Sequence, residues 1–476
     1  MRLFNLLETG IPVFGKTFEV SLNWIGNLIR MLCEAVEDNI IGVGLGIILF
    51  SLALKLITLP FDIYQRISMR KQNLQMEANK EKMEKLQKQY ANDKEKYNQK
   101  VMEMYKENGI SMFSSCLPMI LSLVIFIVAI NAFNAFAQYS NINNYNTMVE
   151  AYNAELAPYC AVLTEENKED YTLTQDTDGS YTYTVQNDEA DKYIYYKVYS
   201  SEKIADTAIV TTLNEAQKTY FINVEKAMNN ADIKAAVQGE INAGVSQEDA
   251  VYNYFVNLAQ NAVVRAYEEE VTKNMKFLWI KNVWAVDASY KHPVLDYTSF
   301  KTEAEREEFE VNGEDIKFSN ITSYTNAYGE DNYNLVTAKL TAQKEEANGY
   351  FILIALSIAT ILLQQFIMQR SQKAQSKYSS VDGQAASQQK MTMIIMTGMF
   401  AIFSFMYSSA FSIYMITSNV FSMLSTLIIN KFVDMKMAKA TAAIETKKLE
   451  NPVTARIEKA KNAGRASAEE SKKKNK

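Results

Sequence analysis

Lys55 is the residue whose type and position most directly predict chemistry in this chain. It lies within the apolar stretch 40–63, which is long enough to cross a bilayer. A charge near the middle of a lipid-facing helix costs roughly 2.5 to 3.5 kcal/mol, whereas each surrounding Leu or Ile recovers only about 0.3 to 0.6 kcal/mol. We therefore expect Lys55 to face a wet cavity or a partner and to mark a functional site inside the membrane. The alternative is a lysine that snorkels along its own stem to the headgroups.

Polar side chains in the other apolar stretches extend this prediction. Hydroxyl and amide groups are expensive in hydrocarbon unless they meet water or one another. Beside Lys55 they predict a hydrophilic groove, although hydrogen bonding between helices would explain each of them singly. The candidate groove residues are Ser51, Thr58, Gln364, Gln365, Thr397, Ser404, Ser418 and Asn419.

Membrane-spanning helices are the elements that must position these residues. The mean hydropathy of -0.17 resembles that of a soluble protein, because apolar and polar blocks cancel. Locally, apolar runs of spanning length occur near 40–63, 112–137, 350–368 and 391–430. The last is about 40 residues long, so we expect two spans with a turn at 407–409. The predicted fold class is an all-α polytopic membrane protein with a five-helix core.

The charge pattern predicts which loops lie on which side of the membrane. Lys and Arg are dense between residues 66 and 106, in 370–390 and after Lys431, which the positive-inside rule assigns to the cytoplasm. Residues 138–348 carry about 35 acidic and 17 basic side chains and are expected outside. Five spans then place the N-terminus outside and the C-terminus in the cytoplasm. Residues 1–39 lack an apolar core of signal-peptide length, so the first span is expected to direct insertion.

These boundaries predict the domain order. It is an outer segment at 1–39, span 1 at 40–64, a cytoplasmic helical hairpin at 65–109, span 2 at 110–137, an inserted extracytoplasmic α+β domain at 138–348, span 3 at 349–369, a cytoplasmic loop at 370–390, span 4 at 391–409, span 5 at 410–431 and a basic cytoplasmic tail at 432–476. Inside the insert, alternating Tyr/Thr-rich runs near 171–174, 181–185 and 193–199 predict a small antiparallel sheet, and 213–275 is expected to be helical.

Two amphipathic segments flank the first span. Apolar residues recur at spacings of three and four from 18 to 36, which predicts a helix in the outer interface with Trp24 as an anchor, or one packed on the outer domain. After the span, apolar residues recur every seven positions and a turn signal follows at Asn92 and Asp93, which favours an antiparallel pair of helices. The apolar seam of this hairpin includes Met76, Met83, Leu86, Tyr90 and Tyr97.

Four motifs then occur in order along the chain. They are Lys55 ahead of Leu59-Pro60, Tyr105-Lys106 ahead of Cys116-Leu117-Pro118-Met119, Phe277-Leu278-Trp279-Ile280-Lys281, and Ser412-Ile413-Tyr414 with Thr417-Ser418-Asn419 and Ile428-Ile429-Asn430-Lys431. Together they resemble the YidC family of membrane protein insertases over roughly residues 17–137, 270–290 and 349–432. No single motif is specific, but the family's order is kept.

The resemblance implies a function in the plasma membrane of a bacterium. In that family five helices enclose a polar groove that is open to the cytoplasm and to lipid and closed to the outside. The groove receives nascent membrane proteins and releases their hydrophobic spans into the bilayer. Lys55 would attract acidic residues of these clients, the hairpin would capture clients first, and Trp279 would anchor the outer interface. Membrane lipid, the ribosome and the Sec translocon are candidate partners, and no cofactor, metal or specific nucleic acid is expected.

The chain departs from the family pattern in two ways. Lys55 stands where the family usually has arginine, and a lysine can lose its proton when desolvated, so the groove charge would depend more on hydration. About 200 residues also separate the second and third spans, where the family normally has a short loop.

The sequence contains no motif that is typical of a catalytic site. His292 is the only histidine, and the three cysteines, Cys33, Cys116 and Cys160, lack metal-ligand spacing. We therefore expect a protein that is not an enzyme. Two other classes stay open: a small transporter or channel with an outer gating domain, and a receptor whose outer domain senses a ligand. Transporters usually show internal repeats and broken helices, which are not evident here.

Overall fold

The computed structural model describes most of the chain. The described residues are 8–11, 15–36, 42–78, 80–107, 113–161, 171–185, 192–200, 213–371 and 384–449. The last 27 residues of the basic tail lie outside them.

The chain divides into two compact units. The sheet unit comprises Met1–Ser51, Phe126–Ala359 and Gly398–Ile416, and the hairpin unit comprises Leu52–Ile125, Thr360–Thr397 and Thr417–Lys476. The division falls within every long apolar helix. Each of these helices therefore contributes one part to each unit.

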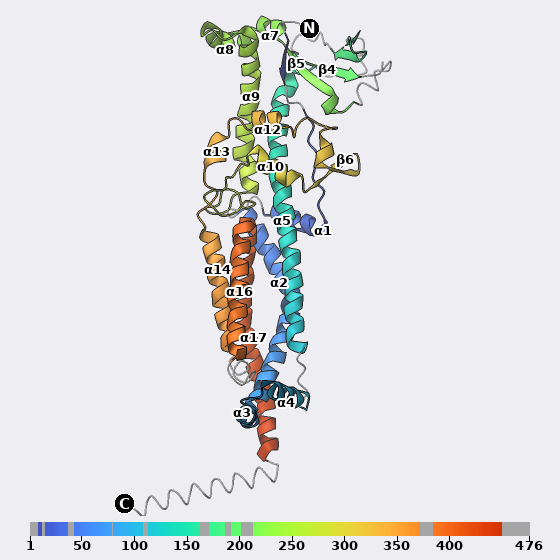
Figure 1. Cartoon of the computed structure of the whole chain (residues 1–476). Helices are drawn as coiled ribbons and strands as arrows, with labels where there is room; N and C mark the ends of the chain where they lie inside the picture. Colours follow the sequence, from blue (N-terminus) through green and yellow to red (C-terminus); the bar gives the residue numbers. More distant parts are fainter. Residues whose placement is uncertain are drawn as a thin grey trace, which may run out of the picture. The chain divides into compact units, whose positions relative to one another are not determined.

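All five predicted spans are helical (Figure 1). The helices are α2 (Val43–Ala78), α5 (Phe113–Leu156), α14 (Ile352–Ser371), α16 (Gln384–Met406) and α17 (Ser409–Leu449). Among the described residues, three segments are long and apolar enough to cross a membrane: Val43–Tyr64, Val124–Tyr159 and Ser409–Ile429. Ile352–Met368 and Thr397–Met406 are apolar but shorter. The protein is therefore mostly helical, with membrane helices of clear spanning length at three of the five predicted places.

Three of these helices continue past the expected ends of their spans. α2 runs on to Ala78, α17 to Leu449, and α5 continues 19 residues past 137. The extension of α5 is rich in asparagine, which has a poor helix propensity. Its amides are used in contacts: Asn146 Nδ2 donates to Phe18 O at 2.9 Å, and Asn153 Nδ2 donates to Gly15 O at 3.0 Å. Tertiary contacts thus override a poor helix propensity.

A five-stranded antiparallel sheet gives the sheet unit its name. The strands are β1 (Glu8–Ile11), β2 (Tyr171–Gln175), β3 (Tyr181–Val185), β4 (Ile194–Ser200) and β5 (Lys218–Asn223), in the order β1-β5-β4-β3-β2. The three predicted strands are confirmed. The prediction that 213–275 is helical is wrong at β5, and β1 was missed, because both strands are short and pair with residues far away in sequence.

Short elements complete the sheet unit. They are α1 (Trp24–Glu34), η1 (Ala157–Tyr159), η3 (Glu215–Gln217), α7 (Val224–Asn229), α8 (Ala231–Asn242), α9 (Gln247–Glu269), η4 (Val271–Asn274), α10 (Tyr297–Ala304), β6 (Glu308–Val311), β7 (Glu314–Lys317), α11 (Phe318–Ile321), α12 (Glu330–Val336) and α13 (Thr341–Glu345). β6 and β7 form a two-stranded antiparallel ribbon.

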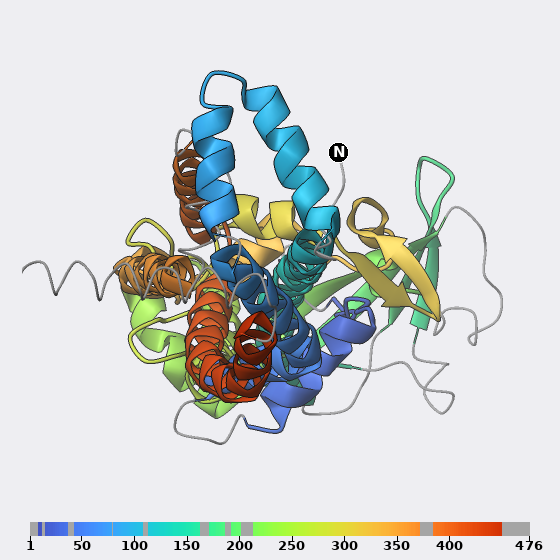
Figure 2. The ribbon, with the colours of Figure 1, turned by 90° about the horizontal axis from the view of Figure 1, so that it is seen from below.

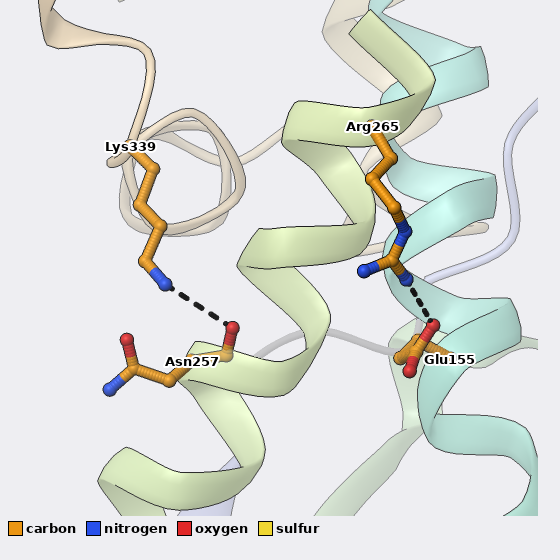
Figure 3. Close-up of polar contacts among 4 residues, drawn as sticks. All are labelled: Glu155, Asn257, Arg265 and Lys339. Atoms are coloured by element: carbon orange, nitrogen blue, oxygen red, sulfur yellow. Dashed lines mark hydrogen bonds and ion pairs between the residues drawn. The ribbon is translucent and has the colours of Figure 1, made fainter. Parts of the chain in front are cut away.

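Polar contacts hold α9 to its neighbours (Figure 3). Arg265 Nη2 lies 2.8 Å from Glu155 Oε2 on α5, and Lys339 Nζ donates to Asn257 O at 3.3 Å and to Asn261 Oδ1 at 2.6 Å. These groups are exposed or half-buried, so we expect them to fix orientation more than to add stability.

An aromatic core lies between α5, α10 and α12. Tyr145 packs its ring 4.9 Å from that of Phe300 and 4.7 Å from that of Tyr333, and the rings of Phe300 and Tyr333 are 4.7 Å apart. Tyr145 donates to Ala327 O at 2.7 Å and Tyr333 donates to Leu295 O at 2.7 Å, so the buried hydroxyls are satisfied. This core packs α10 and α12 against the C-terminal part of α5.

The hairpin unit takes its name from α3 (Lys80–Gln89) and α4 (Lys94–Glu107), which pack side by side (Figure 2). The predicted turn is confirmed. Asp93 Oδ1 accepts from Lys96 N at 3.0 Å at the start of α4. The hairpin helices are therefore shorter than 65–109, because α2 continues through the first part of that range.

Candidate functional site

Lys55 lies in the hairpin unit, on the turn of α2 that precedes a proline. Its side chain is half-buried, whereas Leu56 and Ile57 are exposed. Pro60 stands within the helix and has no N–H, so the carbonyl of Leu56 receives no bond from it. Thr58 Oγ1 donates to Lys55 O at 3.1 Å. Lys55 therefore lies where the backbone hydrogen bonding of α2 is interrupted.

Polar side chains join the other long helices within the hairpin unit. Thr397 Oγ1 on α16 donates to Gln365 Oε1 on α14 at 3.0 Å, and Asn419 Nδ2 on α17 donates to Thr360 Oγ1 on α14 at 3.2 Å. Gln364 is half-buried beside them on α14. These contacts bring predicted groove residues from three helices together, with α14 in common. Hydrogen bonding between helices and lining of a groove are both compatible with them.

One face of α17 carries a row of buried hydroxyls, of which only one was predicted from the sequence. Ser418 was predicted, and Ser422, Ser425 and Thr426 follow it at helical spacing. Ser425 Oγ donates to Ser422 O at 3.1 Å. Ser418 Oγ has no partner among the described residues. The spacing of three and four residues in the sequence could have predicted this row.

Two predicted groove residues belong to the sheet unit, and their hydroxyls are used inside it. Ser51 is fully buried and donates to Ile47 O at 2.6 Å. Ser404 donates to Phe400 O at 3.0 Å and its oxygen lies 3.1 Å from that of Ser357. Ser51 therefore bonds within its own helix, whereas Ser404 also joins α16 to α14, which is the helix-to-helix hydrogen bonding that the sequence left open.

Aromatic rings fill the space between the long helices within the sheet unit. Phe126 on α5 packs against Phe400 on α16 and Phe411 on α17, with ring centroids 4.9 and 5.9 Å away. Phe133 packs against Phe50 on α2 at 5.3 Å and Tyr414 on α17 at 5.5 Å. The rings join four helices into an apolar core. The sheet-unit parts of the long helices also bury hydroxyls within this mainly apolar packing, among them Ser357, Ser404 and Ser412.

A loop that we call the clasp, residues 277–288, ties the ends of the long helices together in the sheet unit. Asp287 is 1% exposed, and its carboxylate caps α14: Oδ1 accepts from Tyr350 N at 2.8 Å and Phe351 N at 3.1 Å, and Oδ2 accepts from Leu353 N at 2.6 Å. A carboxylate at a helix N-terminus is also favoured by the helix dipole. A side chain at Gly349 would collide with Asp287 Oδ1, at 2.0 Å from an added Cβ.

Buried amides connect the clasp to two further helices. Asn282 Nδ2 donates to Asn141 Oδ1 on α5 at 3.0 Å, and Asn348 Nδ2 donates to Asn282 O at 2.9 Å. At the start of α17, Ser409 N donates to the carbonyl of residue 285 at 2.8 Å and Ala410 N donates to that of residue 283 at 2.9 Å. Composition gave no signal for this loop, because its role depends on the backbone path.

Phe277, the first residue of the clasp, packs on the beginning of α2. Its ring lies 1.9 Å from where a Cβ on Gly44 would stand, so only glycine fits there. Gly46 likewise meets Cys33 of α1. Both glycines therefore allow close packing against the beginning of α2. The clasp therefore contacts the first turns of α2, α14 and α17.

Two half-buried glutamates give the sheet unit its titratable site near neutral pH. Desolvation raises the pKa of Glu303 from 4.5 to about 7, against the opposing effects of a hydrogen bond from Asn141 and of the charge on Arg306. Asn141 Nδ2 donates to Glu303 Oε2 at 2.9 Å. Desolvation also raises the pKa of Glu307 to about 7, and the nearby Glu303 adds to that shift.

The two predicted interface anchors differ in exposure. Trp24 is 76% exposed at the start of α1, where Asn23 Oδ1 accepts from Gly26 N at 2.9 Å. Trp279 in the clasp is half-buried, and its indole nitrogen has no partner in the part of the chain that the structure describes. Exposure at Trp24 suits an anchor, and an anchoring role stays a prediction for both.

The predicted capture residues of the hairpin are divided by burial. Tyr97 is buried, and it interacts with Gln87 of α3 across the pair. Its place is therefore the seam between helices. Leu86 and Tyr90 are half-buried, and the side chains of Met76 and Met83 lie outside those that the structure describes. Leu86 and Tyr90 are the described members that a client could reach.

Comparison with known proteins identifies the family. The family model described as 60Kd inner membrane protein matches residues 35–176 and 250–437, which together exceed half of the chain. The chain belongs to this family. The match confirms the resemblance stated on the motifs, and the family's own description places it in an inner membrane. Residues 177–249, which include β3, β4, β5 and α8, fall outside the match.

Curated relatives of the family cover the chain in part. The membrane protein insertase YidC of Clostridium perfringens is 37% identical over 110 residues, which is 21% of this chain and 44% of that protein. Proteins of the same name from Caldanaerobacter subterraneus and Fusobacterium nucleatum are 34% and 31% identical over 101 and 108 residues, 21% and 22% of this chain, and 47% and 51% of those proteins. The chain spans about half the length of the curated relatives it matches. No solved structure matches the chain.

Proposed function

We propose that this chain is a membrane protein insertase, which receives nascent membrane proteins at a polar surface of the hairpin unit and releases their hydrophobic spans into lipid. Family membership and relatives named membrane protein insertase YidC support this function. The observation that carries it is the division of the same five helices into an aromatic part and a part with Lys55 and a set of amides.

The polar surface lowers the cost of moving a client's polar segment into the bilayer. The Lys55 ammonium attracts acidic residues of that segment, and Gln364 and Asn419 supply amide groups that exchange hydrogen bonds with its backbone. Binding stays weak because the client must also leave. Its apolar span then moves into lipid, where Leu56 and Ile57 are exposed beside the charge.

The sheet unit does not offer the client a comparable polar surface. Its rings fill the space between four helices, and the clasp binds the first turns of α14 and α17 through Asp287 and backbone hydrogen bonds. A polar chain would have to break this packing to go further. The client is therefore held partway and is diverted sideways into lipid.

The proposed topology has five spans, with the sheet domain outside and the hairpin in the cytoplasm. The positive-inside pattern supports it, because Lys and Arg concentrate around α3, α4 and the end of α17. The hairpin would meet clients first through Leu86 and Tyr90. The ribosome and the Sec translocon are candidate partners on that side.

Depletion of the protein tests the proposal. The client is a small single-span protein with an acidic N-terminal segment, and protease protection reports its insertion. We expect insertion to fall on depletion and to return when the wild-type chain is supplied. Solute flux is measured in the same cells. Unchanged insertion together with altered flux would contradict the proposal and favour a transporter.

A further inference from the structure

The sheet unit carries a basic and aromatic surface at the starts of the long apolar helices. We call it the collar, and define it as Lys273, Lys276, Leu278, Lys281, Tyr290, Lys291 and Tyr350. Every member is exposed, with Leu278 at 60% and Tyr350 at 63%. Large apolar side chains gathered at one exposed place indicate an interaction surface.

The collar lies where the helices begin, as its backbone contacts establish. The carbonyls of Lys273 and Lys276 lie 3.6 and 3.5 Å from where a Cβ on Gly42 would stand, just before α2. Tyr350 directly precedes α14 and its N–H is bound by Asp287. The clasp, which includes Leu278 and Lys281, binds the start of α17 through the Ser409 amide. The starts of spanning helices mark the edge of the hydrocarbon, so the collar lies at headgroup level.

The charge of the collar contrasts with the rest of the domain. Residues 271–292 hold four lysines and one acid, Asp287, whereas 138–348 as a whole hold about 35 acids and 17 bases. Asp287 is buried and its carboxylate is occupied by the α14 amides. Two collar lysines have acidic neighbours: Lys281 lies 3.6 Å from Glu346, and the charge of Lys291 acts on Glu303. An otherwise acidic domain therefore turns its basic side toward the bilayer edge.

Two backbone positions support a surface that is held in place for contact. Leu278 and Phe351 adopt φ of 52° and 63°, which bulky residues rarely do. In this conformation the Leu278 side chain is exposed. Backbone strain that exposes an apolar side chain is accounted for when that side chain has a binding partner.

We propose that the collar binds anionic phospholipid headgroups of the adjoining leaflet, with its lysines on the lipid phosphates and Leu278, Tyr290 and Tyr350 inserted among the headgroups. The chemistry is that of basic residues beside an anionic bilayer, with aromatic rings at the interface. The proposal requires that the long helices cross the membrane and is independent of whether the chain inserts clients.

Trp279 provides a reporter inside the collar. The chain has three tryptophans; Trp284 is buried, so Trp24→Phe leaves Trp279 as the indole that lipid can reach. The full chain is reconstituted in phosphatidylcholine bilayers that contain an equal small fraction of brominated phosphatidylglycerol or brominated phosphatidylcholine. We expect the brominated phosphatidylglycerol to quench Trp279 at least about twofold more strongly, and the difference to shrink at high salt.

Matched variants decide the cause of any preference. One variant changes the four collar lysines to glutamine. The control makes the same change at four lysines elsewhere in the sheet unit: Lys226, Lys234, Lys301 and Lys317. The collar variant should lose the preference for phosphatidylglycerol and the control should keep it. Equal quenching by the two lipids, a preference that survives in the collar variant, or no quenching by either lipid would overturn the proposal.

Discussion

The two parts of each long helix differ more from each other than the helices differ among themselves. On α14, Ser357 in the sheet unit lies two turns before Gln364 in the hairpin unit, and on α17 Ser412 lies two turns before Asn419. In the sheet unit the spaces between helices are filled by rings such as Phe126 and Phe411. In the hairpin unit, amides and hydroxyls hydrogen-bond between helices, as Thr397 does with Gln365 and Asn419 with Thr360.

This contrast shows how one set of helices can be tightly packed in one unit and can still offer a binding surface for a client in the other. Aromatic packing and the Asp287 cap give the sheet unit contacts that are costly to break. The hairpin unit has a half-buried lysine, a proline-interrupted ladder and hydrogen bonds that water or a client can replace. Only the second arrangement suits a transient binding site.

Removing the charge at Lys55 should have the largest effect. Lys55→Ala is expected to lower insertion of an acidic single-span client about 100-fold, equivalent to about 2.7 kcal/mol, because a client carboxylate in the bilayer costs roughly that amount without a counter-charge. Lys55→Arg should retain most activity, and both proteins should accumulate normally. Insertion is measured by protease protection. Equal activity of the two variants would remove the role of the charge.

Breaking the clasp should lower stability. Asp287→Ala leaves the amides of Tyr350 and Leu353 without an acceptor at the start of α14, whereas Phe351 N keeps the Asp287 backbone carbonyl. We expect thermal unfolding in detergent to report a loss on the order of 2 to 3 kcal/mol. Asp331→Ala, at an exposed aspartate of the same unit, is the matched control and should cost no more than about 1 kcal/mol. Similar losses in both variants would show that the cap does not hold the sheet unit together.

The raised pKa values of the two glutamates in the sheet unit predict that the stability of the protein falls as pH rises. Because the folded pKa of Glu303 is raised to about 7 from 4.5, its contribution is fully present below pH 4.5 and is lost as pH rises through 7. Glu303→Gln should flatten this decline and stabilise the protein at pH 8 by about 1 to 2 kcal/mol, after allowance for solvent screening. Unfolding is followed from pH 4.5 to 8. An unchanged slope in the variant would contradict the assignment.

Substitution of a single polar group should have the smallest effect on insertion, and the effect should differ between the two units. Asn419→Leu is expected to lower insertion about threefold, the equivalent of about 0.6 kcal/mol for one hydrogen bond in a membrane. Ser404→Ala removes a hydroxyl that serves packing in the sheet unit, and should leave insertion unchanged. The two variants are compared in the same protease-protection assay. A greater loss with Ser404→Ala would reverse the assignment of the two parts.

Periodicity and charge predicted the helices, the hairpin turn and three strands, because these depend on local patterns. The extension of α5, the strands β1 and β5, and the clasp could not be predicted, because each depends on contacts with residues far away in sequence, such as Asn146 with Phe18. Among the site residues, polarity within a span selected Gln365 and Asn419 together with Ser51 and Ser404. Only burial and hydrogen-bond partners distinguish the first two residues from the two serines.

Crosslinking of stalled nascent chains tests the central claim most directly. A photoreactive residue is placed at Ser357 or Gln364 on α14, and at Ser412 or Asn419 on α17, so that each pair shares a helix face. The account predicts client crosslinks at Gln364 and Asn419, and background levels at Ser357 and Ser412. Equal crosslinking within each pair, or stronger crosslinking at the two serines, would contradict it.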